Sequence, residues 1–111
     1  MEIRFYQTTS GRNPVLEFVR LLSADLRKEF SQATSLLEKG EQLAMPLSRN
    51  LANIHPGLHE LRFRDKSGIY RVFNYVKLRQ AIYMLHALQK KTREISLKEI
   101  AIIRKRIREV K

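Results

Sequence analysis

Alternating apolar and polar residues predict a first β-strand at residues 2–7, EIRFYQ. Three further strands are predicted at about residues 58–64, 69–76 and 81–88. The connections between these three are only the short segments DKSG and KLR. Because connections of this length join antiparallel neighbours, the pattern predicts an antiparallel meander in the second half of the chain.

Apolar residues at helical spacing predict three helices. The first begins at Pro14, with Asn13 as its N-cap, and the second is capped by Ser23 and stops at Gly40. The third begins after Ser96, where the sequence S-x-x-E has the spacing of a capping box. Its apolar stripe is opposed by a basic face, so we expect it to pack as an amphipathic helix.

The stretch 41–57 shows no regular period, because prolines, asparagines and a glycine interrupt it. We therefore expect an exposed connector there. The predicted order is strand, helical hairpin, three strands and helix within one domain, residues 1–111. This order is typical of the α+β class, and we expect the helices to pack on one face of an antiparallel sheet.

Positive charge is concentrated in the second half of the chain. The whole protein has 22 Lys and Arg against 11 Asp and Glu, a net charge of +11. Residues 1–59 contribute a net +1 and residues 60–111 a net +10. Such a field favours polyanionic partners, namely nucleic acid, an acidic membrane surface or an acidic protein. The alternative is a basic protein whose charge serves only solubility.

Several classes of protein are not supported by the composition. No apolar run is long enough to span a membrane, and the first ten residues lack the features of a targeting segment, so we expect a cytoplasmic protein. The chain has no cysteine, and its three histidines lack the spacing of a zinc site. We therefore expect neither disulfide bonds nor a metal ion.

The first strand of the predicted meander places charged residues on one face. Alternate residues point to opposite faces, so Leu61 and Phe63 share the face that we assign to the core. Glu60, Arg62 and Arg64 then form a row on the uncovered face, about 7 Å apart. Guanidinium groups can bind phosphates there. The alternative is that these residues only protect the sheet from edge-to-edge aggregation.

Arg71 and a basic loop extend this row. Apolar residues occupy both alternate sets of the strand that contains Arg71, so parity leaves its direction undetermined, and we expect it on the open face. Lys90, Lys91 and Arg93 follow the last strand and can overhang the same face; a solvated charge run is the alternative. His86, with apolar neighbours at alternate positions, is expected to be a core or rim residue.

The segments GLHELRFRDKSGIYRVFNYV and LHALQKKTREISLKEIAIIRKRI resemble the phage-derived Gp49-like, HigB-type branch of the RelE/ParE toxin superfamily. The specific parts are G-L-x-E-L-R-x-R-x-x-x-G-I-Y-R-V-F at residues 57–73 and K-K-T before a basic helix. The resemblance implies a RelE-like fold and a ribonuclease toxin that cuts mRNA, usually in the ribosome. It also implies a cognate antitoxin and a toxin–antitoxin hetero-oligomer.

The resemblance assigns roles to individual positions. Arg71 matches an arginine that stabilises the scissile phosphate, and Arg62 lies near a strand lysine that serves in proton transfer. Lys91 matches a second phosphate-contacting basic residue. In two places the sequence departs from the RelE branch: Glu60 replaces a lysine, and Leu97 lies near the position of a catalytic tyrosine.

Cleavage by such a site needs no metal or other cofactor. The RNA 2′-hydroxyl attacks the neighbouring phosphate, and fixed cations stabilise the developing charge. Arginines are poor bases because their pKa lies above ~12, so Glu60, a lysine or Tyr70 must accept the proton, and we favour Glu60. Glu60 can instead form a structural ion pair with Arg62 or Arg64. The residues expected to bind RNA phosphates are Arg64, Tyr70, Lys90 and Arg93.

Two other functions fit the same composition. The first is a ParE-like toxin that inhibits DNA gyrase by binding it, although the arginine row argues against this. The second is a non-catalytic module that binds RNA or the ribosome, which would not require an acidic residue within the row.

Overall fold

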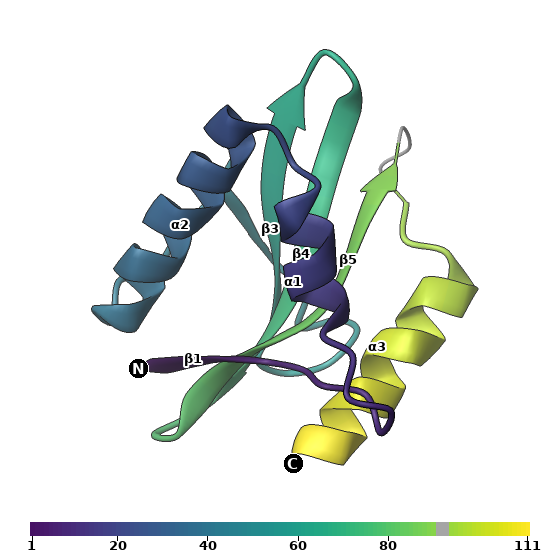
Figure 1. Cartoon of the computed structure of the whole chain (residues 1–111). Coiled ribbons are helices and arrows are strands. Elements are labelled where there is room, and N and C mark those ends of the chain that lie inside the picture. Colours follow the sequence, from purple (N-terminus) through teal and green to yellow (C-terminus); the bar gives the residue numbers. More distant parts are fainter. Residues whose placement is uncertain (91–93) are drawn as a thin grey trace.

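The protein forms a five-stranded sheet flanked by three helices in its computed structural model, which describes residues 1–90 and 94–111 (Figure 1). The strands are β1 Glu2–Phe5, β2 Ser48–Asn50, β3 Leu58–Asp65, β4 Gly68–Lys77 and β5 Ala81–Lys90. The helices are α1 Pro14–Arg20, α2 Ala24–Glu38 and α3 Leu97–Val110. The α+β class and the order of the predicted elements are confirmed, and β2 is an addition.

The strand order in the sheet is β1-β5-β4-β3-β2. The strands β3, β4 and β5 form the predicted antiparallel meander, and β2 pairs antiparallel with β3. In contrast, β1 pairs parallel with β5, so the sheet is mixed. A parallel pair cannot be joined by a tight turn, and here the chain between β1 and β5 contains α1, α2 and the strands β2, β3 and β4.

Helix boundaries follow the capping residues. The hydroxyl of Ser23 accepts a hydrogen bond from Leu26 N at 3.2 Å, and that of Ser96 accepts one from Glu99 N at 3.3 Å. Asn13 makes no side-chain capping bond, although Pro14 does begin α1. Gly40 has φ +86°, a left-handed conformation that ends the turn after α2.

Helices cover both faces of the sheet, which corrects the expectation that all would pack on one. On β5, Ile82 and Met84 belong to the core cluster that contains α1 and α2 residues, whereas Leu85 belongs to the cluster with Ile103 and Ile107 of α3. Figure 1 shows α2 and α3 on opposite sides of the strands. The reason is that β4 and β5 are apolar at both alternate sets of positions, so two faces need cover.

The stretch 41–57 is not simply an exposed connector. Within it, β2 lies at the sheet edge, where Arg62 N donates to Leu47 O at 2.8 Å and Leu51 N donates to Leu58 O at 2.9 Å. Leu51 is fully buried. A strand of three residues is too short to show a period of two, which is why the pattern does not reveal it.

A β-bulge shifts the register between β4 and β5. Phe73 pairs with His86, but Asn74 pairs with Met84, so Leu85 is the extra residue. Leu85 and His86 consequently both face α3. His86 is partly buried, which agrees with the expected rim position, and its ring stacks on Phe73 at 6.1 Å between centroids. Strict alternation predicts that His86 and Met84 share a face, but the bulge places them on opposite faces.

Polar contacts fix α3 against this bulge. His86 Nε2 pairs with the Glu99 carboxylate, and Arg106 Nη1 donates to Leu85 O at 2.8 Å. The Arg106 guanidinium also lies 4.7 Å from the centre of the Tyr6 ring. Glu99 is therefore used for packing α3 on the sheet. No helix in residues 1–90 and 94–111 is long and apolar enough to cross a membrane.

Candidate functional site: an arginine cluster around a buried glutamate

Charged residues of three neighbouring strands converge on the face of the sheet that α3 partly covers. In the strand register Arg49 of β2 lies opposite Glu60 of β3, and Arg62 of β3 lies opposite Arg71 of β4. Residues directly opposite in an antiparallel pair share a face. With Arg64, two positions further along β3, these residues form what we call the arginine cluster, with Glu60 within it.

Glu60 is fully buried and lies between two of the guanidinium groups. Its Oε1 is 3.3 Å from Arg62 Nε, and its Oε2 is 3.8 Å from Arg71 Nη1. Arg71 is buried as well, with 1% of its side chain exposed, whereas Arg62 keeps 15% exposed. Arg62 therefore links the buried charges to the surface.

Burial dominates the electrostatics of this pair. Desolvation raises the pKa of Glu60 above its ordinary value, and the positive charges of Arg71, Arg62 and Arg49 oppose that rise. Desolvation likewise lowers the pKa of Arg71, with Glu60 acting in the opposite direction. In both groups the loss of hydration outweighs the attraction, so the pair costs the fold free energy that an apolar pair would not.

Arg62 and Arg71 also repel one another. Like charges directly opposite on neighbouring strands destabilise a sheet, and Glu60 supplies the counter-charge that makes the arrangement possible. Glu60 is therefore the ion-pair partner of Arg62 and Arg71. The cluster as a whole still has three more positive than negative charges and remains attractive to an anion.

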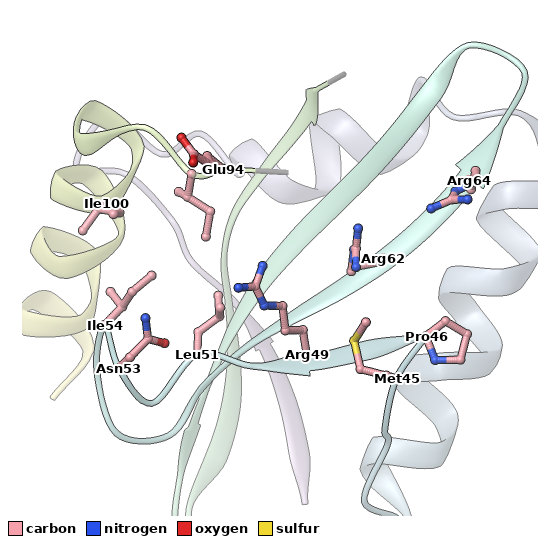
Figure 2. A pocket seen from close by; sticks show the side chains of 11 residues that line it. Met45, Pro46, Arg49, Leu51, Asn53, Ile54, Arg62, Arg64, Glu94 and Ile100 are labelled. Atoms are coloured by element: carbon pink, nitrogen blue, oxygen red, sulfur yellow. The ribbon is translucent and has the colours of Figure 1, made fainter. Parts of the chain in front are cut away.

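A pocket of about 710 Å³ opens beside the cluster. Figure 2 shows Arg49, Arg62 and Arg64 on one side of it, from β2 and β3. The other side is formed by residues near the start of α3 and by the turn after β2, and Figure 2 labels Ile54, Asn53, Ile100 and Glu94 there. The pocket thus has a cationic wall of arginines, beside which Met45 and Pro46 lie, and an apolar wall of isoleucines, which also carries Asn53 and Glu94.

The expected site residues fall into three groups. Arg62 and Arg64 lie in the pocket, as the row on β3 predicts. Glu60 and Arg71 share their face but are buried, so the expectations of an uncovered face at Glu60 and an open face at Arg71 are wrong. The physical reason is that Glu60 and Arg71 lie on the inner strands β3 and β4, so side chains of the neighbouring strands pack around them and exclude water.

Tyr70 lies on the opposite face, away from the cluster. Its ring packs against Phe18 of α1 at 6.3 Å between centroids, and its hydroxyl donates to Asp65 at 3.4 Å. It is therefore not part of the arginine cluster. Lys91 and Arg93 lie outside the described residues, and so does the side chain of Lys90. Leu97, in the first turn of α3, is 85% exposed and does not line the pocket.

Sequence reasoning missed Arg49 and Glu94. Arg49 belongs to the stretch interpreted as a connector, and only its pairing opposite Glu60 places it in the cluster. Glu94 follows the strand that ends at Lys90 and lines the pocket from the far side. The available signal was weak: each is one charged residue in an irregular segment.

The chemistry of the cluster suits anion binding rather than metal binding. Within residues 1–90 and 94–111, no three His, Asp or Glu side chains come together as a metal site would require. Guanidinium groups donate hydrogen bonds and match phosphate oxygens in geometry. The pocket can therefore hold a phosphate ester against the cationic wall.

Comparison with known proteins gives an independent result. The family model described as "Phage derived protein Gp49-like (DUF891)" matches residues 17–108. No curated protein matches the chain. The matched region contains β2, β3 and β4, the strands that carry the arginine cluster, and it extends over most of the sequence. The chain therefore belongs to the phage-derived Gp49-like family, which is the HigB-like branch of the RelE/ParE toxin superfamily.

Proposed function

We propose that this protein is a toxin that cuts mRNA during translation, without a metal ion, at the pocket beside the arginine cluster. The observation that supports this most directly is the combination of a buried Glu60–Arg71 pair with a partly exposed Arg62 beside it. Such a pair weakens the fold, as its pKa directions indicate, and is the kind of arrangement found where charge serves chemistry.

In this proposal Arg62 stabilises the negative charge that develops on the scissile phosphate. Glu60 holds the Arg62 guanidinium from below, and a fixed cation stabilises a transition state without reorganising at the moment of reaction. Arg49 and Arg64 bind flanking phosphates. Arg71 is too buried to touch RNA in this structure, so it acts by fixing Glu60 and thus Arg62.

The general base must be a residue other than Glu60, because Glu60 has no exposed surface. Glu94 is a surface carboxylate on the far side of the pocket, and we propose that it accepts the 2′-hydroxyl proton. The 2′-oxygen then bonds to phosphorus while the bond from phosphorus to the 5′-oxygen breaks. The leaving oxygen takes a proton from water, and the products are a 2′,3′-cyclic phosphate and a 5′-hydroxyl.

We expect cleavage to depend on translation, because the described groups of this pocket include no strong base. A carboxylate is a weak base for a hydroxyl, so the reaction depends on the RNA being held in line for attack. The ribosome can supply that geometry.

Membership of a toxin branch also implies a cognate antitoxin. An acidic segment of the antitoxin would be attracted by the net +10 of residues 60–111, and apolar contacts would supply most of the lasting affinity.

Cell-free translation with primer extension tests this function. The purified protein should cut a translated mRNA and leave the same RNA largely intact without ribosomes. Treating the protein with EDTA and removing the chelator before the protein is added to the ribosomes should leave cleavage unchanged. A protein that blocks gyrase supercoiling and cuts no mRNA would show the ParE-like activity instead. Binding of RNA or ribosomes without any cleavage would identify a non-catalytic module.

A second experiment tests the antitoxin. The protein should co-purify with the product of an adjacent gene, and the complex should no longer cleave mRNA.

A further inference from the structure

The apolar wall of the pocket has no role in binding phosphates. It is formed by Ile54 from the turn after β2, Ile95 before α3 and Ile100 in the first turns of α3. Each of the three is partly exposed. Ile54 and Ile95 pack against the core cluster that contains Leu51 and Ile103, so their positions are fixed from behind. The wall therefore presents a firm apolar surface to the pocket.

The turn that follows β2 is equally well held. Ile54 N donates to Leu51 O at 2.9 Å, and Ala52 N donates to Asn50 Oδ1 at 2.7 Å. The Arg104 guanidinium of α3 reaches Ile54 O at 3.4 Å. These bonds fix the backbone on both sides of Asn53, whose side chain is exposed and lines the pocket.

Asn53 is chemically distinct from the other residues of the pocket. Among the described lining residues it provides the side-chain amide, and that amide makes no hydrogen bond to another described residue. An amide has a donor group and an acceptor group side by side, and it can pair with the edge of a nucleobase. The cationic wall provides donors alone, which match phosphate oxygens, whereas the amide offers a donor and an acceptor together.

We propose that the pocket holds one nucleobase of the RNA against Ile54, Ile95 and Ile100, and that Asn53 hydrogen-bonds its edge and so selects the sequence that is cut. The inference rests on the proposed function. A base has apolar faces and a polar edge, and its phosphate lies on one side, which matches the two walls and the amide of this pocket. A volume of about 710 Å³ is within the range of small-molecule sites and exceeds what a phosphate alone requires.

The change Asn53→Asp provides a directional test. A carboxylate accepts hydrogen bonds but cannot donate them, so it favours bases that present an exocyclic amino group. Primer extension over several translated mRNAs would compare the bases found at each position around the cut for wild type and Asn53→Asp. Preference at one position should change by about 5-fold to 150-fold, the range expected for a pair of hydrogen bonds to a base. Asn53→Ala should weaken the preference at that same position.

One control variant and one further test variant separate the possible outcomes. Gln32→Ala removes an exposed amide from α2, on the other side of the sheet, and should leave the cut-site distribution unchanged. Ile100→Ala should lower the cleavage rate several-fold while the variant keeps its fold, as judged by circular dichroism. If wild type cuts mRNA and both Asn53 variants cut at the wild-type positions with wild-type preferences, the inference is wrong. If wild type cuts nothing, the proposed function itself fails.

Discussion

The two faces of the sheet use the same strands for different purposes. On the face covered by α1 and α2, neighbouring positions such as Leu61, Phe63 and Val72 are apolar and fully or almost fully buried. On the face covered by α3, the alternate positions include Glu60 and Arg71, which are buried to the same degree but charged. One face therefore builds a core, and the other combines a core with a charged cluster.

We interpret this difference as a loss of stability that the proposed function requires. A sheet needs apolar residues on both faces if both are covered. On the α3 face these residues include Phe73 and Leu85, which pack with Ile103 and Ile107 of α3. Charged residues at Glu60 and Arg71 lower stability, because removing them from water costs more than their attraction returns. Their presence on one face alone is the reason that we place the proposed site on that face.

Arg71→Ala should have the largest effect on stability. The change leaves Glu60 buried with part of its counter-charge removed, and we expect the free energy of unfolding to fall by about 3–5 kcal/mol. The matched change on the other face is Val72→Ala, which deletes a buried apolar group and should cost about 2 kcal/mol. Urea denaturation of both variants measures the difference. If Arg71→Ala lost no more unfolding free energy than Val72→Ala, the expected cost of leaving Glu60 buried without Arg71 would be contradicted.

Arg62→Ala should reduce cleavage by about 10²–10³-fold, because it removes the proposed transition-state donor. Arg62→Lys should recover part of the rate, since lysine keeps the charge but lacks the planar pair of donors. Arg27→Ala, on the exposed surface of α2, is the control and should not change cleavage. Single-turnover rates on ribosome-bound mRNA would measure this. Full activity in a folded Arg62→Ala protein would remove this residue from the site.

Glu94→Gln should reduce cleavage by about 10²-fold, the usual lower range for loss of a general base. Affinity for RNA should stay the same or increase, because a negative charge leaves the pocket. Glu29→Gln on α2 is the matched control and should be neutral in both assays. Cleavage rates and filter-binding affinities would be measured together. A parallel loss of binding and rate in Glu94→Gln would indicate a structural role.

Glu60→Gln should reveal a small dependence of stability on pH. Burial raises the pKa of Glu60 in the folded state above 4.5, so the folded protein takes up this proton more readily than the unfolded chain. The stabilising contribution of Glu60 is therefore complete below 4.5 and is lost as pH rises through the folded-state pKa. Wild type should gain stability relative to Glu60→Gln as pH falls toward 4.5, by roughly 1.4 kcal/mol per unit of pKa difference. A constant difference, or one of opposite sign, would contradict this.

Local sequence signals were sufficient for most of the fold. Ser23 and Ser96 are caps that satisfy backbone groups a few residues away, and Gly40 ends a helix through its own backbone conformation. The meander also follows from short-range turns. The bulge at Leu85 was beyond such reasoning, because one extra residue on β5 is defined only by its register with β4.

For the site, the sequence by itself determined the charged row of Glu60, Arg62 and Arg64, because alternation along a strand is a local property. Only the tertiary structure decided that Glu60 is buried, that Arg71 lies opposite Arg62, and that Arg49 joins them from an edge strand. Burial and pairing depend on which distant segments cover a face. The chemistry of this site therefore depends on contacts between β2, β3, β4 and α3 that a linear pattern does not contain.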